Sequence, residues 1–291
     1  MRDKISSKRK QKRKTNTDLQ KLLQDAIVRN DPDAVRNAIA SGADPNAPGS
    51  DNICPLCMAC KQPDMGAATA LLDAGGDIDA TDNDGRTALW HMANEGNTAA
   101  CRFLIEAGAD RGKWDDDNQP PFEIACWEGH ADVIQLFLLY DPDIIGKNKG
   151  YPHIHMACGG KDMDTVRLLL GYGADVNDVD ENNDTPLHVV MVEWANRPVL
   201  PELVRLLLER GADPDSRNRS GYSPADILLD PHNKAPQKQE IITVFKEYAP
   251  GALFRSAVSL KEGVAREEII DWYREHHPEM VMEKFCTMAP G

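Results

Sequence analysis

The 291-residue sequence has no long apolar stretch. A membrane-spanning helix needs roughly 18 consecutive apolar residues, and the longest clean run, Val133 to Tyr140, is shorter and contains Gln135. No apolar segment follows the charged residues Met1 to Lys14, so the start of the chain does not resemble a classical secretory signal. We therefore expect a protein without a transmembrane segment that is not secreted by that route and is cytoplasmic, or else nuclear.

Familiar catalytic motifs are also missing. The sequence contains no GxSxG, Walker, GxGxxG or HExxH pattern. His276 and His277 are adjacent in a charged segment, with no other His or Cys at ligand spacing, and we expect both to be solvated. We predict that the chain is not an enzyme and has no small-molecule substrate, cofactor or metal.

Cysteine is scarce, with seven residues in the chain. An odd number, scattered singly through apolar positions, indicates buried free thiols and not a disulfide framework. Cys54, Cys57 and Cys60 have CxxCxxC spacing, which could hold zinc or an iron–sulfur cluster. No fourth ligand is near in the sequence, so we favour a structural role for the three cysteines.

Positive charge is concentrated at one end of the chain. The formal net charge is −14, whereas residues 1–14 carry +7, which leaves −21 on the remainder. Such an acidic body is expected to attract basic partners and to repel nucleic acid. The basic run in the tail is typical of a nuclear localisation signal, but it also suits nucleic-acid or membrane contact, or a solubilising tail folded back on the acidic body. Its candidate targeting residues are Lys8, Arg9, Lys10, Lys12, Arg13 and Lys14.

An internal repeat organises the rest of the chain. Gly-Ala-Asp or Gly-Gly-Asp recurs about every 33 residues, starting at Gly42, Gly75, Gly108, Gly173 and Gly211, with five extra residues before the last copy. Each interval holds a short alanine-rich stretch, a break, and a longer apolar run at helical spacing that is closed by Gly. This pattern predicts pairs of helices joined by polar hairpin-like connections, stacked on their neighbours.

These residues resemble the ankyrin repeat family. The matching motifs include Asp84-Gly85-Arg86-Thr87-Ala88-Leu89, Thr185-Pro186-Leu187-His188 and Gly221-Tyr222-Ser223-Pro224, in addition to the Gly-Ala-Asp tails. The resemblance covers about residues 18–250 as seven repeats. It implies an all-α ankyrin-repeat solenoid of about seven helix pairs joined by short β-hairpin loops, here called fingers, with residues 1–17 as a disordered basic tail and 251–291 as a helical cap.

Repeat four departs most from this pattern. Pro120-Pro121-Phe122-Glu123 replaces the Thr-Pro-Leu-His start, and Asp141 replaces the closing Gly. The repeat is either remodelled for binding, a flexible joint, or the result of drift. The family pattern also implies that His155 and His188 form hydrogen bonds along the row of fingers, and that Cys60, Cys126 and Cys158 occupy a buried small-residue column.

In the ankyrin family, ligands usually lie across the finger tips and the exposed face of the first helices. Carried over column by column, the resemblance implies a non-catalytic scaffold, adaptor or inhibitor, monomeric when unbound, that binds a basic segment of another protein in this groove. An effector or nuclear regulator carried by the tail is the alternative. We expect Trp114 and Trp127 to clamp an apolar or cationic side chain. The full set of candidate contacts is Asp84, Arg86, Glu95, Trp114, Asp116, Asp117, Trp127, Glu128, Lys149, Tyr151, Glu181, Asp184, Arg219 and Tyr222.

Overall fold

The structure is a computed structural model that describes residues 15–48, 53–146, 151–160, 162–192, 200–230, 233, 237–259 and 264–276. The chain divides into two compact units, residues 1–124 and 125–291. Among the described residues the helices form seven successive pairs, followed by two further helices. None of these helices has both the length and the apolar character that a membrane span requires.

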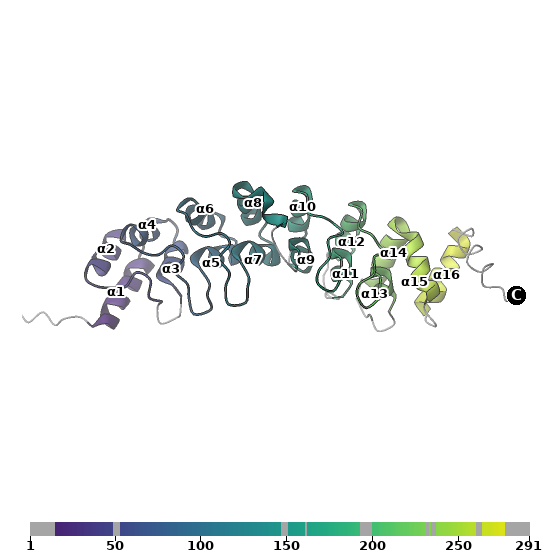
Figure 1. The fold of residues 1–291 in the computed structure, drawn as a ribbon, viewed down its shortest axis with the longest axis horizontal. Coiled ribbons are helices and arrows are strands. Elements are labelled where there is room, and N and C mark those ends of the chain that lie inside the picture. The colour runs from purple at the N-terminus through teal and green to yellow at the C-terminus, as the bar shows by residue number, and fades with distance from the viewer. Residues whose placement is uncertain are drawn as a thin grey trace, which may run out of the picture. The chain divides into compact units, whose positions relative to one another are not determined.

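Unit one stacks helix pairs in two rows. It contains α1 (Asn16–Val28), α2 (Pro32–Ala40), α3 (Pro55–Cys60), α4 (Gly66–Asp73), α5 (Ala88–Asn94) and α6 (Thr98–Glu106). The first helices of the pairs, α1, α3 and α5, form one row, and α2, α4 and α6 form the other (Figure 1). Helix α7 (Pro121–Glu128) begins in unit one and ends in unit two.

Unit two repeats the same arrangement. Its helices are α8 (Ala131–Tyr140), the 3₁₀ helix η1 (Pro142–Gly146), α9 (His153–Gly159), α10 (Met163–Gly171), α11 (Pro186–Val192), α12 (Leu200–Glu209), α13 (Pro224–Leu229), α14 (Lys238–Tyr248), α15 (Pro250–Ser259) and α16 (Val264–His276). Helix α15 packs on α13 and α14, and α16 packs on α15 (Figure 1). After the seventh helix pair the described chain thus continues as two helices, α15 and α16.

Side-chain caps start several of the first helices, although α9 follows Pro152 without one. Thr87 accepts a hydrogen bond from the Trp90 N–H at 3.1 Å, and Ser223 forms a reciprocal capping box with Asp226. In α3 the cap position is taken by Cys54, whose sulfur lies 3.1 Å from the Cys57 nitrogen. A capped amide would otherwise lack a partner at the helix start, so each cap fixes where its helix begins.

Left-handed glycines end the second helices, as predicted. Gly42, Gly75, Gly108, Gly173 and Gly211 have φ between +88° and +105°, where a side chain would be strained. Repeat four differs here too. Asp141 follows α8 with φ −149°, in extended backbone, and the chain then forms η1. Asp141 therefore ends α8 without entering the left-handed region, which a residue with a side chain adopts less readily than glycine.

The interpretation of all seven cysteines as free thiols was wrong. Cys54 and Cys57 form a disulfide with 5.2 Å between their Cα atoms. The N-cap residue and the third residue of a helix lie within the Cα separation that a disulfide requires. The number of cysteines in the sequence carries no information on this local geometry. Cys60, Cys101, Cys126 and Cys158 are buried and lie outside any disulfide, as expected of buried thiols.

Candidate protein-binding surface

An aspartate or asparagine side chain holds each described finger in shape. The Asp115 Oδ1 accepts from the N–H groups of Asp117 at 3.1 Å and Gln119 at 2.7 Å. Asp82, Asp180 and Asn218 occupy the same column and also accept N–H groups from their own fingers. Short polar side chains form such turns because they reach the backbone two to four residues on. These bonds therefore fix the backbone conformation of each finger.

Adjacent fingers are also tied to one another within each unit. The Asp116 N–H donates to the Asp84 carbonyl at 3.0 Å in unit one, and the Arg219 N–H donates to the Asn182 carbonyl at 2.9 Å in unit two. The closeness of the first contact shows at Gly85, where a Cβ would lie 2.6 Å from the Asp116 carboxylate. Gly85 has φ +74° and so suits the finger tip in two ways.

Long side chains on the first helices add a second set of ties between fingers. The His155 Nε2 donates to the Asp184 carbonyl at 2.7 Å, and the His188 Nε2 donates to the Tyr222 carbonyl at 3.0 Å. These bonds confirm the structural role predicted for both histidines. Burial lowers the pKa of His155, and likewise that of His153, which bonds the Ile145 carbonyl at 3.0 Å. Burial thus favours the neutral form of the His153 and His155 imidazoles.

Trp90 also ties its helix to the next finger, and this role was not predicted from the sequence. Its Nε1–H donates to the Gln119 carbonyl at 3.1 Å, and the side chain is 6% exposed. Trp90 stands three residues after the capping Thr87, in the column of His188, and this register was the signal that could have identified it. Trp90 thus belongs to the scaffold of the fingers and not to their exposed face.

Exposed acidic side chains and one tryptophan gather on two fingers of unit one. Trp114 is 55% exposed, and Asp84, Asp116 and Asp117 are also exposed. We call these four residues the acidic finger surface. The bond from the Asp116 N–H to the Asp84 carbonyl ties together the two fingers that carry these four residues.

Arg86 pairs with carboxylates of both fingers and lies over the Trp90 ring. Its guanidinium lies 3.2 Å from Asp84, 3.5 Å from Asp115 and 3.5 Å from Asp117, and its Cζ is 4.5 Å from the centre of the Trp90 ring. Asp115 is buried, whereas the other two carboxylates are largely exposed. Arg86 therefore neutralises part of the acidic charge and stiffens the two fingers.

The other candidate contacts differ in exposure. Glu95 is exposed and forms an ion pair with Lys61 at 2.5 Å. Trp127 is only partly exposed, and Glu128 and Tyr151 are also intermediate. Of the two tryptophans predicted to clamp a partner side chain, Trp114 is thus exposed and Trp127 is half-buried. Lys149 and the tail residues Lys8, Arg9, Lys10, Lys12, Arg13 and Lys14 lie outside the described residues.

In unit two, three of the candidates are exposed and one is half-buried. Glu181, Arg219 and Tyr222 are exposed, with Tyr222 at 54%. Asp184 is half-buried, and its carboxylate accepts from the Asn218 side chain at 2.8 Å while its carbonyl accepts from His155. Asp184 therefore acts first as a tie between fingers.

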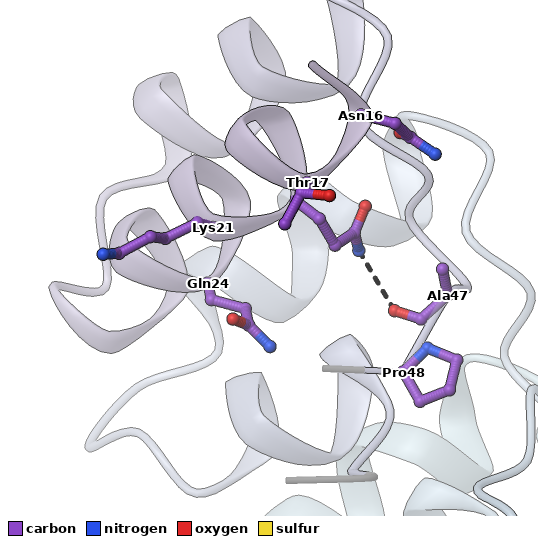
Figure 2. Close-up of a pocket in the computed structure, with 7 residues that line it drawn as sticks. Asn16, Thr17, Lys21, Gln24, Ala47 and Pro48 are labelled. Carbon is purple, nitrogen blue, oxygen red and sulfur yellow. Dashed lines mark hydrogen bonds between the residues drawn. The ribbon is translucent and has the colours of Figure 1, made fainter. Parts of the chain in front are cut away.

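A pocket lies at the start of unit one, between α1 and the first finger (Figure 2). It is lined by Asn16, Thr17, Gln20, Lys21, Gln24, Ala47 and Pro48. The Gln20 amide crosses to the Ala47 carbonyl at 3.0 Å and to the Asp44 carbonyl at 2.9 Å. Its one charged lining residue is a lysine, so the pocket does not continue the acidic finger surface.

Comparison with known proteins identifies the repeat. The family described as ankyrin repeats in three copies matches residues 22–115, 56–148 and 122–218. The chain belongs to the ankyrin repeat family. The all-α ankyrin-repeat solenoid predicted from the sequence is thereby confirmed as the fold class, and its solved relatives agree. The ankyrin repeat domain of Bcl-3 matches with a TM-score of 0.61 at 22% identity over 77% of this chain and 97% of that one. The human ASB11 ankyrin repeat domain matches with a TM-score of 0.61 at 25% identity over 76% and 96%.

Curated relatives share shorter stretches with this ankyrin repeat protein. Human protein phosphatase 1 regulatory subunit 27 is 35% identical over 97 residues, which are 33% of this chain and 56% of that protein. The Saccharomyces cerevisiae target of rapamycin complex 2 subunit AVO2 is 33% identical over 110 residues, covering 36% and 24%. The chain thus spans about half of the first relative's length and a quarter of the second's. What these stretches share is the repeat.

Proposed function

We propose that this ankyrin repeat protein is a non-catalytic scaffold, adaptor or inhibitor that binds a basic segment of another protein on the acidic finger surface. The observation that carries the proposal is Trp114, a large aromatic side chain that is 55% exposed on the finger whose backbone Asp115 holds. Tryptophan is among the residues most enriched at energetically important positions of protein interfaces. The exposed part of this side chain adds nothing to the buried core of unit one, which favours a role in binding.

Charge supports a basic partner. Asp84, Asp116 and Asp117 are exposed beside Trp114, and Arg86 already pairs with two of them and with Asp115. Exposed carboxylates speed and orient the approach of a cationic segment more than they add affinity. An arginine or lysine of the partner could then place its cation over the indole face, with its stem against the ring edge.

The named relatives are consistent with a binding role. One is named as a regulatory subunit of protein phosphatase 1 and another as AVO2, a subunit of target of rapamycin complex 2. Both names describe proteins that assemble with others. By analogy alone, this chain would act by assembling with a partner, and its own residues supply the proposed contact surface.

Charge-neutral variants test the electrostatic part of the proposal. The partner is first identified by cross-linking and mass spectrometry, and its association rate is then measured with Asp116→Asn/Asp117→Asn. The matched control is Asp73→Asn/Asp132→Asn, which removes two exposed carboxylates from α4 and α8 on the second helices of their repeats.

We expect a several-fold lower association rate for the finger variant at low ionic strength. The difference from wild type should vanish near 0.5 M salt, where charges separated by more than about 4 Å are screened. Equal rates for the finger variant and its control at low salt would contradict a basic partner at this surface.

A further inference from the structure

The cap and third positions of the first helix hold a recurring pair of side chains. In repeat six the pair is Thr185 and His188, whose Oγ1 and Nδ1 atoms lie 2.8 Å apart. In repeat three it is Thr87 and Trp90. His188 and Trp90 each donate to a carbonyl of the next finger. This pair therefore starts the helix and ties it to its neighbour.

Repeat two replaces that pair with the disulfide. Cys54 is the cap of α3, Cys57 is its third residue, and both side chains are 0% exposed. Helix α3 spans only Pro55–Cys60, and it packs on α1, α4 and α5. The bridge joins the two ends of the first turn covalently, at the position where the other repeats use hydrogen bonds.

Nearby thiols are held in their unreactive form. Burial raises the pKa of Cys60 to about 12, and burial together with the neighbouring Cys60 raises that of Cys101 to about 12. The thiolate is the form that attacks a disulfide. Neither of these two thiols therefore competes for the bridge at neutral pH, and an external thiol or disulfide is the partner that we consider for exchange.

We propose that Cys54 and Cys57 form a reversible redox pair that sets the local stability of repeat two. In the oxidising direction, one thiolate attacks glutathione disulfide and releases one glutathione, leaving a mixed disulfide. The second cysteine then attacks that sulfur and releases the other glutathione. Two protons and two electrons pass from the protein thiols to the two glutathione molecules, and the same steps in reverse reduce the bridge.

Reduction should loosen the first turn of α3 without unfolding the other repeats. Stability in a repeat protein is a sum of local terms, so loss of one tie acts on its own repeat and the adjacent ones. Because both sulfurs are buried, exchange requires local opening of α3, and the switch is expected to respond slowly.

The full chain equilibrated in glutathione buffers tests this inference. Thiols are trapped with an alkylating reagent and located by peptide mass spectrometry across a series of reduced-to-oxidised ratios. Hydrogen exchange is then compared between the two states. The control is Cys54→Thr/Cys57→His, which restores the pair of repeat six and cannot form the bridge.

We expect alkylation of Cys54 and Cys57 to titrate together as a two-electron couple. Amides of residues 54–60 should exchange on the order of tenfold faster in the reduced protein, from the loss of a short covalent loop. Amide exchange in residues 186–192 should be the same in both states. In the control variant, amide exchange should not depend on the glutathione ratio. Thiols that stay fully alkylatable at every ratio would overturn the proposal, as would a bridge whose reduction leaves exchange in residues 54–60 unaltered.

Discussion

The shape of the finger that carries Trp114 depends on Asp115, and its substitution gives a quantitative test. The buried carboxylate accepts two backbone N–H groups, from Asp117 and Gln119, and lies 3.5 Å from Arg86. Hydrogen bonds to a charged acceptor contribute about 1.5–3 kcal/mol each, and the exposed donors place these at the lower end. Asp115→Ala is therefore expected to cost about 3 kcal/mol of the free energy of unfolding.

Asp115→Asn supplies the matched control, because Asn218 fills the same column and accepts the Tyr222 N–H at 3.0 Å through its amide oxygen. We expect the asparagine variant to lose under about 1 kcal/mol, since one acceptor oxygen serves both amides. In urea, with a slope near 3 kcal/mol/M, the alanine variant should shift the unfolding midpoint by about 1 M. Equal midpoints for the two variants would refute the view that this side chain holds the finger.

Three further perturbations probe other parts of the structure. Burial lowers the pKa of His155 and His153, so the unfolded chain binds protons more readily than the folded chain below the ordinary value of 6.5. The free energy of unfolding should therefore be highest above that pH and fall below it, by up to about 1.4 kcal/mol per pH unit per histidine. Urea unfolding of His155→Gln at several pH values should show a smaller slope. Gly85→Ala should lower the midpoint by more than the same change at Gly112, whose φ is not in the left-handed region and whose added Cβ would meet its nearest atom at 3.6 Å. Fluorescently tagged protein lacking residues 1–14 should lose nuclear accumulation if the tail is a targeting signal, and an unchanged distribution would remove that role.

Regular features of the repeat could be predicted because each has a local cause. Thr87 caps its helix through contacts within one turn, and Gly173 closes another because a left-handed residue is required there. His155 and His188 bond the next finger since both stand at the same position of their repeats and face the equivalent carbonyl, that of Asp184 or Tyr222. Such features need only the sequence and the period.

Features that depend on a particular neighbour were harder to predict. Arg86 was taken as a partner contact, but three carboxylates from two fingers converge on it. Trp127 stands in an exposed column and is nonetheless partly covered. The Cys54–Cys57 bridge was missed because counting cysteines ignores the geometry of a helix start. In each case the outcome depends on which side chains are close together in the folded protein.

The role of Trp114 as an interface anchor is most directly tested by the dissociation constant of the identified partner for Trp114→Ala. Tyr172→Ala is the control, since Tyr172 is 47% exposed at the end of α10, on a second helix of its repeat. Loss of an interface anchor costs about 2 kcal/mol or more, so we predict roughly 30-fold weaker binding for the tryptophan variant and unchanged binding for the tyrosine variant. Unchanged affinity for Trp114→Ala would contradict the proposed binding surface.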